Sequence, residues 1–179
     1  MSLQLLTEGT TLALYHDTEN GWLYADWQGE LTLPTVQENC LTIAQYFLQG
    51  DYRQVLNDNT NVVSVSADIS PWLASEYLPY IVLGDVDHIA WVYSPILSAQ
   101  CYTDLAVYAL NSPVVALFSD MDAACSWLKS ARFRHPTSAD DQGPNMERLA
   151  RLLQSRHDTA SLIEVMGTRG IHLYPTENL

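Results

Sequence analysis

The chain has 179 residues and a formal net charge of −13, and 47% of its residues are hydrophobic. This length and apolar content suit one globular domain, or one domain with an appendage. Before residue 129 Arg53 is the only basic residue, against 15 acidic ones, whereas the remainder carries 7 basic and 6 acidic residues. Such an acidic body repels nucleic acid and anionic lipid surfaces, so neither is an expected partner.

Neither a targeting segment nor a membrane span is predicted. No window has 18 consecutive apolar residues, and MSLQLLTEGT lacks the basic region and long apolar core of a signal peptide. We therefore expect a cytoplasmic protein. Cys40, Cys101 and Cys125 are far apart and lack CxxC spacing, so the sequence predicts buried free thiols without disulfides or a zinc site.

The predicted elements begin with a β-hairpin. Two alternating apolar runs, residues 11–16 and 22–28, flank the strong turn dipeptide Asn20-Gly21. A candidate edge strand at residues 3–6 precedes them. The alternation places one face of the hairpin inward.

Helices alternate with strands along the rest of the body. Residues 32–49 form the clearest helix, with a predicted core stripe of Val36, Cys40, Ile43, Ala44 and Phe47. Then follow a strand at 53–56, a helix at 70–83, a strand at 88–93, a helix at 96–110 with Leu97, Cys101, Leu105 and Tyr108 at helical spacing, a strand at 114–118 and a helix ending at Lys129. This alternation implies parallel strands joined by right-handed crossovers.

Three parts of the chain are predicted. Residues 1–130 form the α/β domain, residues 131–144 form a linker by composition, and residues 145–179 form a C-terminal helix plus a short β appendage. The helix, at 145–157, bears arginines and has an apolar face of Met146, Leu149, Leu152 and Leu153. The charge asymmetry suggests that this tail lies on the acidic body or on a partner.

The stretch from Arg53 to Pro79 is the first place to expect a small site. A short strand precedes the polar run NDNTN at residues 57–61, whose side chains bond their own backbone and favour loops. Loops at the carboxyl ends of strands are the usual binding region of an open α/β sheet. The run is therefore either a binding loop or a capped turn, followed by a helix that Ser70 caps.

The candidate residues for binding a partner or ligand lie in this stretch. Trp72 and Tyr77, beside the loop, either belong to the core or line a pocket or interface. The full set is Asp58, Asn59, Asn61, Trp72 and Tyr77.

No metal site, cofactor or catalytic motif is predicted. Residues 57–68 fit part of a calcium-loop register, but Val62 stands where that loop requires glycine. HExxH, GxSxG, GxGxxG and Walker patterns are absent from the sequence, so we do not expect an enzyme. An unrecognised hydrolase would need His16 or His88 next to a carboxylate and a nucleophile.

The stretches YADWQGELTLPTVQENCLTI, QVLNDNTNV, ISPWLASEYLP, IAWVYSP and ALFSDMDAACSWL resemble those of small bacterial STAS-like proteins. These have the fold of the anti-sigma-factor antagonists, which CRAL-TRIO-type lipid-binding modules also resemble. The resemblance covers roughly residues 10–130. It implies an α/β domain with a four- to five-strand mixed sheet and helices packed mainly on one face. Members of this fold act mainly by binding a protein partner or a small ligand.

The resemblance also bears on phosphorylation. In the phosphorylated antagonists a DSSG-like motif opens the helix after the central strand, and its serine is the switch. The corresponding residues 57–70 contain no Ser-Gly pair. Phosphorylation would favour Ser66 or Ser70, because phosphate at a helix N-terminus meets free N–H groups. The alternative is that Ser70 is only a helix cap.

Two functions are expected from these observations. The first is a non-enzymatic, STAS-like regulatory module that binds a protein partner, or itself as a homodimer, through residues 57–70 and the following helix. It predicts an exposed apolar or aromatic patch near Trp72. The alternative is a small-molecule or lipid-binding module, with an apolar pocket between sheet and helices and convergent polar groups such as Asp58 and Asn59.

Overall fold

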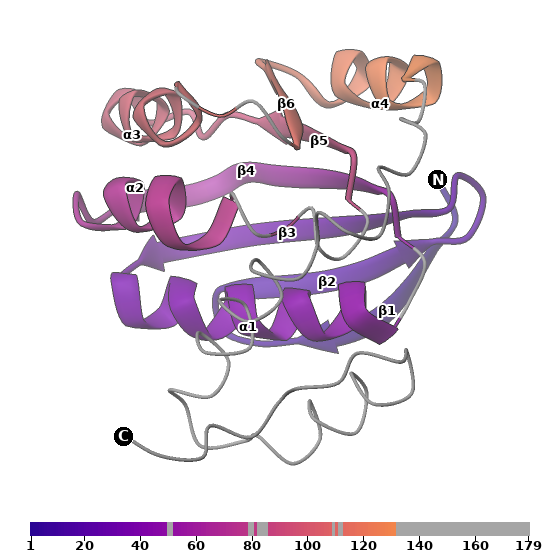
Figure 1. The fold of residues 1–179 in the computed structure, drawn as a ribbon, viewed down its shortest axis with the longest axis horizontal. Helices are drawn as coiled ribbons and strands as arrows, with labels where there is room; N and C mark the ends of the chain where they lie inside the picture. The colour runs from indigo at the N-terminus through magenta and orange to yellow at the C-terminus, as the bar shows by residue number, and fades with distance from the viewer. Residues whose placement is uncertain (50–51, 79–80, 82–85, 109, 111–112, 132–179) are drawn as a thin grey trace, which may run out of the picture.

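The structure is a computed structural model that describes residues 1–49, 52–78, 81, 86–108, 110 and 113–131 (Figure 1). The linker and appendage predicted for residues 131–179 lie outside the described residues, apart from Ala131. The elements in chain order are β1 (Leu3–Glu8), β2 (Leu12–Asp17), β3 (Trp22–Leu31), α1 (Leu33–Gln49), β4 (Gln54–Val65), α2 (Ile69–Trp72), the π-helical segment η1 (Leu73–Tyr77), β5 (His88–Val92), α3 (Leu97–Val107), β6 (Val114–Phe118) and α4 (Met121–Ser130).

The strands of the described residues form one six-stranded sheet whose spatial order follows the chain order. β1, β2 and β3 pair antiparallel, and β3, β4, β5 and β6 pair parallel. The mixed sheet and the hairpin are as predicted, and Gly21 adopts φ 76° in the expected turn. The apolar runs predicted six strands in residues 1–130, which is the number in this sheet, whereas the family resemblance implied four or five.

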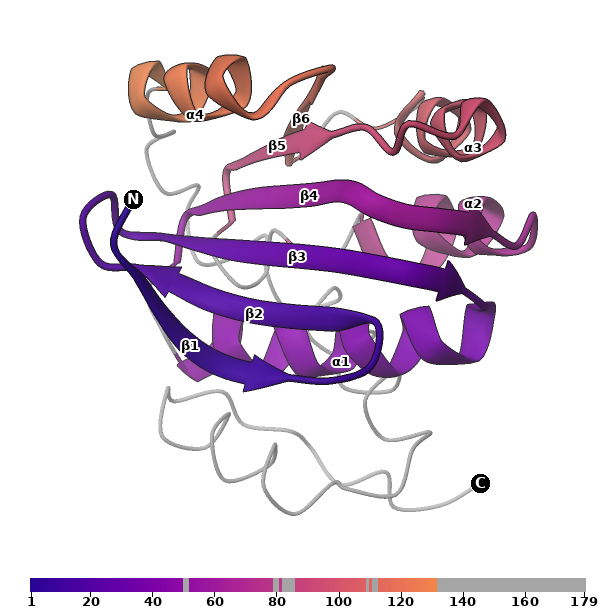
Figure 2. The same cartoon turned by 180° about the vertical axis from the view of Figure 1, so that it is seen from behind.

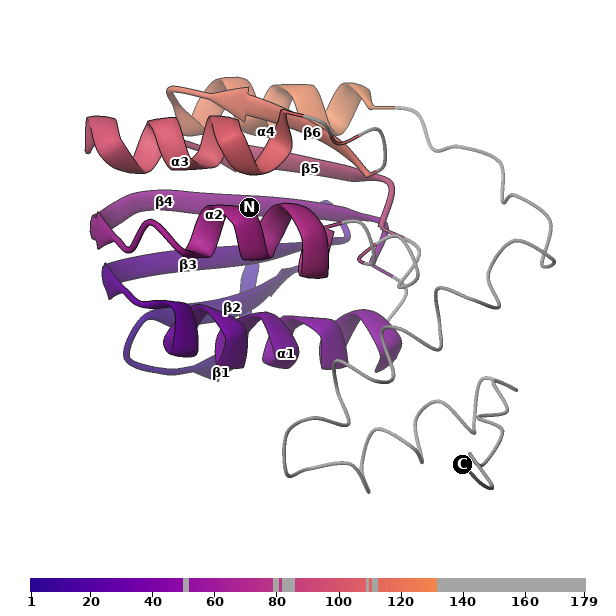
Figure 3. The ribbon, with the colours of Figure 1, turned by 60° about the vertical axis from the view of Figure 1, so that its left-hand side comes forward.

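Helices cover mainly one face of the sheet, as predicted. We call the face against α1, α2–η1 and α3 the front face; its core includes Leu23, Val55 and Ile89 (Figures 1 and 3). On the opposite, back face, α4 packs Ala124 and Leu128 on the second core cluster of Trp22, Leu56, Ala90 and Val92. Figure 2 shows that none of the described helices covers β1, β2 and β3 on the back face.

The predicted core stripe of α1 is confirmed. Its five members have exposed fractions between 2% and 6%: Val36, Cys40, Ile43, Ala44 and Phe47. The apolar period of 3.6 residues was an adequate guide here because one side of this helix meets the sheet and the other side meets solvent.

The predicted loop at residues 57–70 is wrong in its first half. β4 continues through the NDNTN run to Val65, and Asn57, Asp58 and Asn59 are buried within it. β4 lies between β3 and β5, so both neighbours pair its backbone. The backbone hydrogen bonds to these neighbouring strands, together with the side-chain hydrogen bonds of Asn57, Asp58 and Asn59, override the preference of the NDNTN run for a turn.

The helix after this strand begins at Ile69, and Ser70 is not its N-cap. Asp68 occupies the cap position, and the buried Ser70 hydroxyl instead donates to the carbonyl oxygen of Tyr102 on α3 at 2.8 Å. The Ser66 hydroxyl donates to the Asp68 carboxylate at 2.6 Å. Ser70 therefore ties α2 to α3, and phosphorylation of its hydroxyl would require the two helices to separate.

The helix predicted at residues 96–110 forms as α3, but its apolar stripe faces outward. Leu97, Cys101, Leu105 and Tyr108 are all exposed. The inward side is instead made of small residues, of which Ala99 and Ala106 are buried. Cys101 and the half-buried Cys125 thus depart from the prediction of buried thiols, whereas Cys40 agrees with it.

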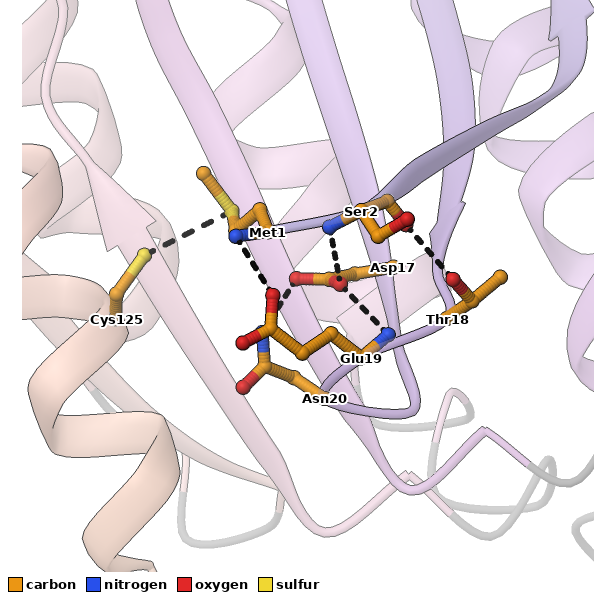
Figure 4. A network of polar contacts seen from close by, with 7 residues as sticks. All are labelled: Met1, Ser2, Asp17, Thr18, Glu19, Asn20 and Cys125. Carbon is orange, nitrogen blue, oxygen red and sulfur yellow. Dashed lines mark hydrogen bonds and ion pairs between the residues drawn. The ribbon is translucent and has the colours of Figure 1, made fainter.

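A polar network attaches the N-terminus to the β2–β3 turn (Figure 4). The buried Asp17 carboxylate accepts hydrogen bonds from the backbone N–H groups of Ser2 and Glu19 and from the Asn20 amide. The terminal ammonium group of Met1 lies 3.0 Å from a Glu19 carboxylate oxygen. Edge strand β1 is therefore anchored at its start by charge and hydrogen bonds, since Leu3 and Leu5 remain exposed.

Among the described residues, no helix is long and apolar enough to cross a membrane.

Candidate functional site

A cavity lies between the front face of the sheet and the helices α1, α2–η1 and α3. The space inside it that is open to the centre of a water molecule measures about 70 Å³. One water needs roughly 10–15 Å³ on this measure, so the cavity holds more than a single water. Its walls are mainly apolar, and include Val36, Ile43 and Phe47 from α1, Val55 and Val62 from β4, and Leu73 from η1.

The side chain of Asn57 contributes an unpaired amide nitrogen, Nδ2, to this cavity. Its Oδ1 accepts a hydrogen bond from Trp27 Nε1 at 2.8 Å. Because an indole nitrogen only donates, this bond fixes which end of the amide is the oxygen. The other end, Nδ2, is buried and has no partner among the described residues.

Trp91 and Tyr77 line the same cavity. The Trp91 Nε1 is buried and lacks a hydrogen-bond partner within the described ranges. The Tyr77 hydroxyl lies against the Cys40 thiol, and burial together with the hydrogen bond to this thiol raises the pKa of Tyr77 well above 10.0. Each buried polar group left unpaired costs about 1–3 kcal/mol, so the unpaired Asn57 Nδ2 and Trp91 Nε1 require an explanation.

Other polar residues of the cavity wall are paired and hold the strands in place. Asn59 donates to the Val92 carbonyl oxygen at 3.0 Å, and the Ser94 hydroxyl donates to the Val62 carbonyl oxygen at 2.9 Å. Trp91 and Ser94 lie at the carboxyl end of β5. The cavity therefore lies where open α/β sheets usually bind ligands.

The structure brings together only part of the predicted site. Asn59 and Tyr77 line the cavity. Trp72 stacks on Tyr77, with ring centroids 5.8 Å apart, but is not part of the cavity wall. Trp72 itself is half-buried and therefore is not a fully exposed aromatic residue.

Asp58 and Asn61 lie away from the cavity. Successive residues of a strand point to opposite faces, so Asp58 is on the back face, between its neighbours Asn57 and Asn59. It accepts hydrogen bonds from the Tyr24 hydroxyl at 3.0 Å and from the Thr60 backbone N–H at 2.9 Å. Asn61 is exposed and donates to Asp26 at 3.3 Å.

Asp26 and Asp58 face each other across β3 and β4 on the back face. Burial, with the Asp58 charge adding to it, raises the pKa of Asp26 against the opposing hydrogen bond from Asn61. Burial and the two carboxylates also raise the pKa of Tyr24. This cluster is internally hydrogen-bonded, and among the described residues no group of three or more His, Cys, Asp or Glu is placed to hold a metal ion.

The histidines proposed for a hydrolase lie among aromatic rings. His16 packs edge-on against Tyr52, with ring centroids 5.3 Å apart, and His88 against Trp127, at 5.6 Å. Neither belongs to the cavity wall.

Trp27, Asn57 and Trp91 line the cavity but were not among the candidate binding residues predicted from the sequence. For Asn57, the alternation of side chains along a strand is the signal that could have identified it. If residues 57–61 are read as a strand, Asn57 and Asn59 share one face and Asp58 falls on the other. Reading the run as a loop removed this distinction.

No protein-family model matches the sequence, and no curated protein matches it significantly. A solved structure that is similar to this chain is that of an uncharacterised protein from the DUF3478 family with a SpoIIAA-like fold, from Shewanella loihica PV-4. The two are 16% identical, with a TM-score of 0.43, and the match covers 69% of this chain and 98% of that chain. The SpoIIAA-like fold named for that protein is of the STAS-like type that the sequence resemblance names.

Proposed function

We propose that this protein is a non-enzymatic binding module that holds a small, mainly apolar molecule in the cavity between the sheet and its helices. One observation carries the proposal: Asn57 and Trp91 line one apolar cavity, and Asn57 Nδ2 and Trp91 Nε1 are buried without partners among the described residues. Ligand sites in proteins commonly combine apolar walls with a few polar groups that fix orientation.

A purely structural core gives no reason for these groups. Leu or Phe at such positions would fill the same space without the cost of unpaired donors. The wall also includes the π-helical segment η1, and π-helical turns are frequent at functional sites. A bound molecule with a polar end satisfies the donors, and its apolar part satisfies the walls.

Filling the cavity tests the proposal. Ala99 and Ala106 are both buried on α3, but only Ala99 lines the cavity. We expect Ala99→Leu to abolish the rise in Tm that small apolar molecules such as acetophenone produce in the wild type. Ala106→Leu is the matched control and retains that rise. Equal ligand response in wild type and Ala99→Leu, with both folded by circular dichroism, would place binding outside the cavity.

A second candidate function is protein–protein contact through α3. Leu97, Cys101, Leu105 and Tyr108 cover an arc of roughly 80° on this helix, at about 100° per residue. The exposed fractions of Leu97, Leu105 and Tyr108 are 74%, 65% and 91%. Apolar residues that follow one helix face in this way are typical of a surface that packs against another helix.

The occupant that we propose for this α3 stripe is an amphipathic helix with basic residues. The body up to Leu128 has one basic and 15 acidic residues, so its charge complements such a helix and opposes a second acidic body. The sequence of residues 145–157 has this pattern, with Arg148, Arg151 and Arg156 beside its apolar residues.

Cys101 lies in the stripe and reports on its coverage. In the full chain we expect a thiol reagent to label Cys101 slowly, and to label it several-fold faster in the variant Arg148→Glu/Arg151→Glu/Arg156→Glu. Cys40 is buried and serves as the internal control in peptide mapping. Labelling at the same rate in both proteins would contradict this occupant, and dependence of the wild-type rate on protein concentration would show that the segment comes from a second copy.

A further inference from the structure

We propose that the cavity selects molecules with an uncharged, carbonyl-type oxygen that accepts hydrogen bonds from Asn57 Nδ2 and Trp91 Nε1. The ligand class is thus small apolar ketones, aldehydes, esters or amides. This inference rests on the proposed ligand-binding function and states which polar end the ligand carries.

The two donors are lateral neighbours in the sheet. The parallel register pairs Asn57 of β4 with Trp91 of β5, and adjacent strands lie about 4.8 Å apart. Both side chains line the cavity, so they leave the same face of the sheet at the same level. One ligand atom placed above the two strands is therefore within reach of both donors.

The donor character of this pair is fixed by its surroundings. Trp27 on β3 donates to Asn57 Oδ1 and thereby leaves only Nδ2 for the cavity. Trp91 offers an indole N–H, which has no acceptor function. Asn57 and Trp91 are register partners, and Trp27 lies two residues beyond Ala25, the partner of Asn57 on β3. Trp27 thus orients Asn57 diagonally across the strands, and Asn57 Nδ2 and Trp91 Nε1 remain open donors among the described residues.

Two adjacent donors match a carbonyl oxygen better than other small groups. A carbonyl oxygen has two lone pairs and no hydrogen. An alcohol also accepts, but its own hydrogen then needs an acceptor that neither donor supplies. A hydrocarbon leaves both donors unpaired, which retains the penalty that the empty cavity carries.

Charge excludes the carboxylate as the preferred acceptor. Among the residues that the structure describes, no Lys or Arg lines the cavity. Arg53, the only basic residue before Lys129, is paired with Asp87 at 2.5 Å. An anion in this apolar site would lose its hydration without a counter-charge, within a body of strongly negative net charge.

A set of probes of similar size separates these classes. Dissociation constants for acetophenone, 1-phenylethanol, ethylbenzene and benzoate are measured by isothermal titration calorimetry on the full-length protein. We expect acetophenone to bind up to about a hundredfold more tightly than ethylbenzene, since it accepts two hydrogen bonds and each net hydrogen bond contributes up to about tenfold. We expect 1-phenylethanol to be intermediate and benzoate to be weakest.

Trp91→Phe removes one donor and keeps an aromatic ring in the wall. It is expected to lower the acetophenone affinity about tenfold and leave the ethylbenzene affinity within about twofold. Trp22→Phe is the matched control, because Trp22 Nε1 is also buried and unpaired among the described residues but belongs to the back-face cluster. It should keep the preference for the ketone. The carbonyl stretch of bound acetophenone should shift to lower wavenumber in the wild type and shift less in Trp91→Phe.

The outcomes separate this inference from the function on which it rests. Equal binding of ethylbenzene or 1-phenylethanol and acetophenone, or tightest binding of benzoate, would overturn the ligand class and leave the binding function standing. A ketone preference that is undiminished in Trp91→Phe would overturn the donor pair. Failure of all four probes to bind at millimolar concentration would overturn the binding function itself.

Discussion

The two faces of β4 treat their polar side chains in opposite ways. On the back face Asp58 accepts hydrogen bonds from the Tyr24 hydroxyl and the Thr60 N–H, and Asn61 pairs with Asp26. On the front face Asn57 leaves one end of its amide unpaired inside an apolar cavity. Asn57 and Asp58 are consecutive in sequence, so neither composition nor strand position explains the contrast.

The contrast separates polar groups that hold the fold from polar groups that await a partner. A buried polar group with all its hydrogen bonds contributes to stability, whereas one with an open donor lowers stability unless something binds to it. On this basis we assign the back face of β4 a structural role and propose the front face as the binding site. Substitutions on the back face should therefore change stability without changing ligand affinity, and those on the front face should do the reverse.

The largest expected effect is that of Asp58→Ala. This substitution leaves the Tyr24 hydroxyl and the Thr60 N–H without their acceptor, and should lower the free energy of unfolding by about 2–3 kcal/mol. Urea unfolding followed by tryptophan fluorescence measures it. Affinity for acetophenone should remain within twofold of the wild type while the variant is folded. A specific loss of affinity with unchanged stability would reverse the assignment of the two faces.

Asp17 provides a pH-dependent form of the same test on the back face. Burial would raise the pKa of Asp17, but hydrogen bonds from the Asn20 amide and the backbone N–H groups of Ser2 and Glu19 outweigh it and lower the pKa below 3.8. A lowered pKa in the folded state stabilises the protein above pH 3.8, and this contribution is lost as the pH falls through the folded-state value.

We therefore expect Asp17→Asn to destabilise the protein by about 1–2 kcal/mol at neutral pH, where the wild-type carboxylate is charged. The difference should shrink as the pH is lowered below about 4. Thermal unfolding of both proteins between about pH 3 and pH 7 measures this. A constant difference across that range would mean that the ionisation of Asp17 is not what the network stabilises.

Most of the fold was predictable because local pattern and tertiary environment agree. The core stripe of α1 and the turn at Asn20-Gly21 follow from spacing and turn chemistry that any context would reinforce. The NDNTN run was misread because its residues favour turns in isolation. Here pairing with strands on both sides decides the conformation, and that pairing is not a local property of the sequence.

The site was less predictable than the fold. Tyr77 and Asn59 were identified from their position beside the central strand. The key pair of Asn57 and Trp91 instead depends on the register of two strands, which brings together residues 34 positions apart in the chain (91 − 57 = 34). The stripe of α3 shows the same limit, since helical spacing identified Leu97 and Leu105 but not which side of the helix faces the sheet. Spacing gives periodicity, and only packing gives direction.

Two tyrosines allow a matched comparison of the faces. Tyr24→Phe removes a hydroxyl that donates to Asp58 on the back face, and should destabilise the protein by about 1 kcal/mol. Tyr77→Phe removes a hydroxyl on the front face that lies against the Cys40 thiol, a weak hydrogen-bonding partner, and should change stability by less than about 0.5 kcal/mol. Chemical denaturation of both variants under one set of conditions measures the contrast. Equal losses for the two would show that the Tyr77 hydroxyl is held as strongly as that of Tyr24.

The smallest expected effect is a stabilisation by Asp26→Asn. The pKa of Asp26 is raised, by burial first and then by the Asp58 charge, so ionised Asp26 is less favourable in the folded state than in the unfolded state. Stability is therefore lost as the pH rises from 3.8 through the folded-state pKa, and the variant should avoid this loss.

At neutral pH the expected gain is about 0.2–1 kcal/mol, the range for like charges directly opposite on neighbouring strands, with the lower end favoured because solvent screens the half-buried Asp26. The gain should disappear below about pH 4, where the wild-type carboxyl is protonated. Glu30→Gln changes the net charge equally at an exposed position of β3 and controls for the overall charge of the body. If Glu30→Gln stabilises the protein as much as Asp26→Asn, relief of the global negative charge is sufficient, and Asp26 and Asp58 do not repel each other locally. A gain confined to Asp26→Asn means that even the paired back face retains one local conflict, which the Asn61 hydrogen bond only partly offsets.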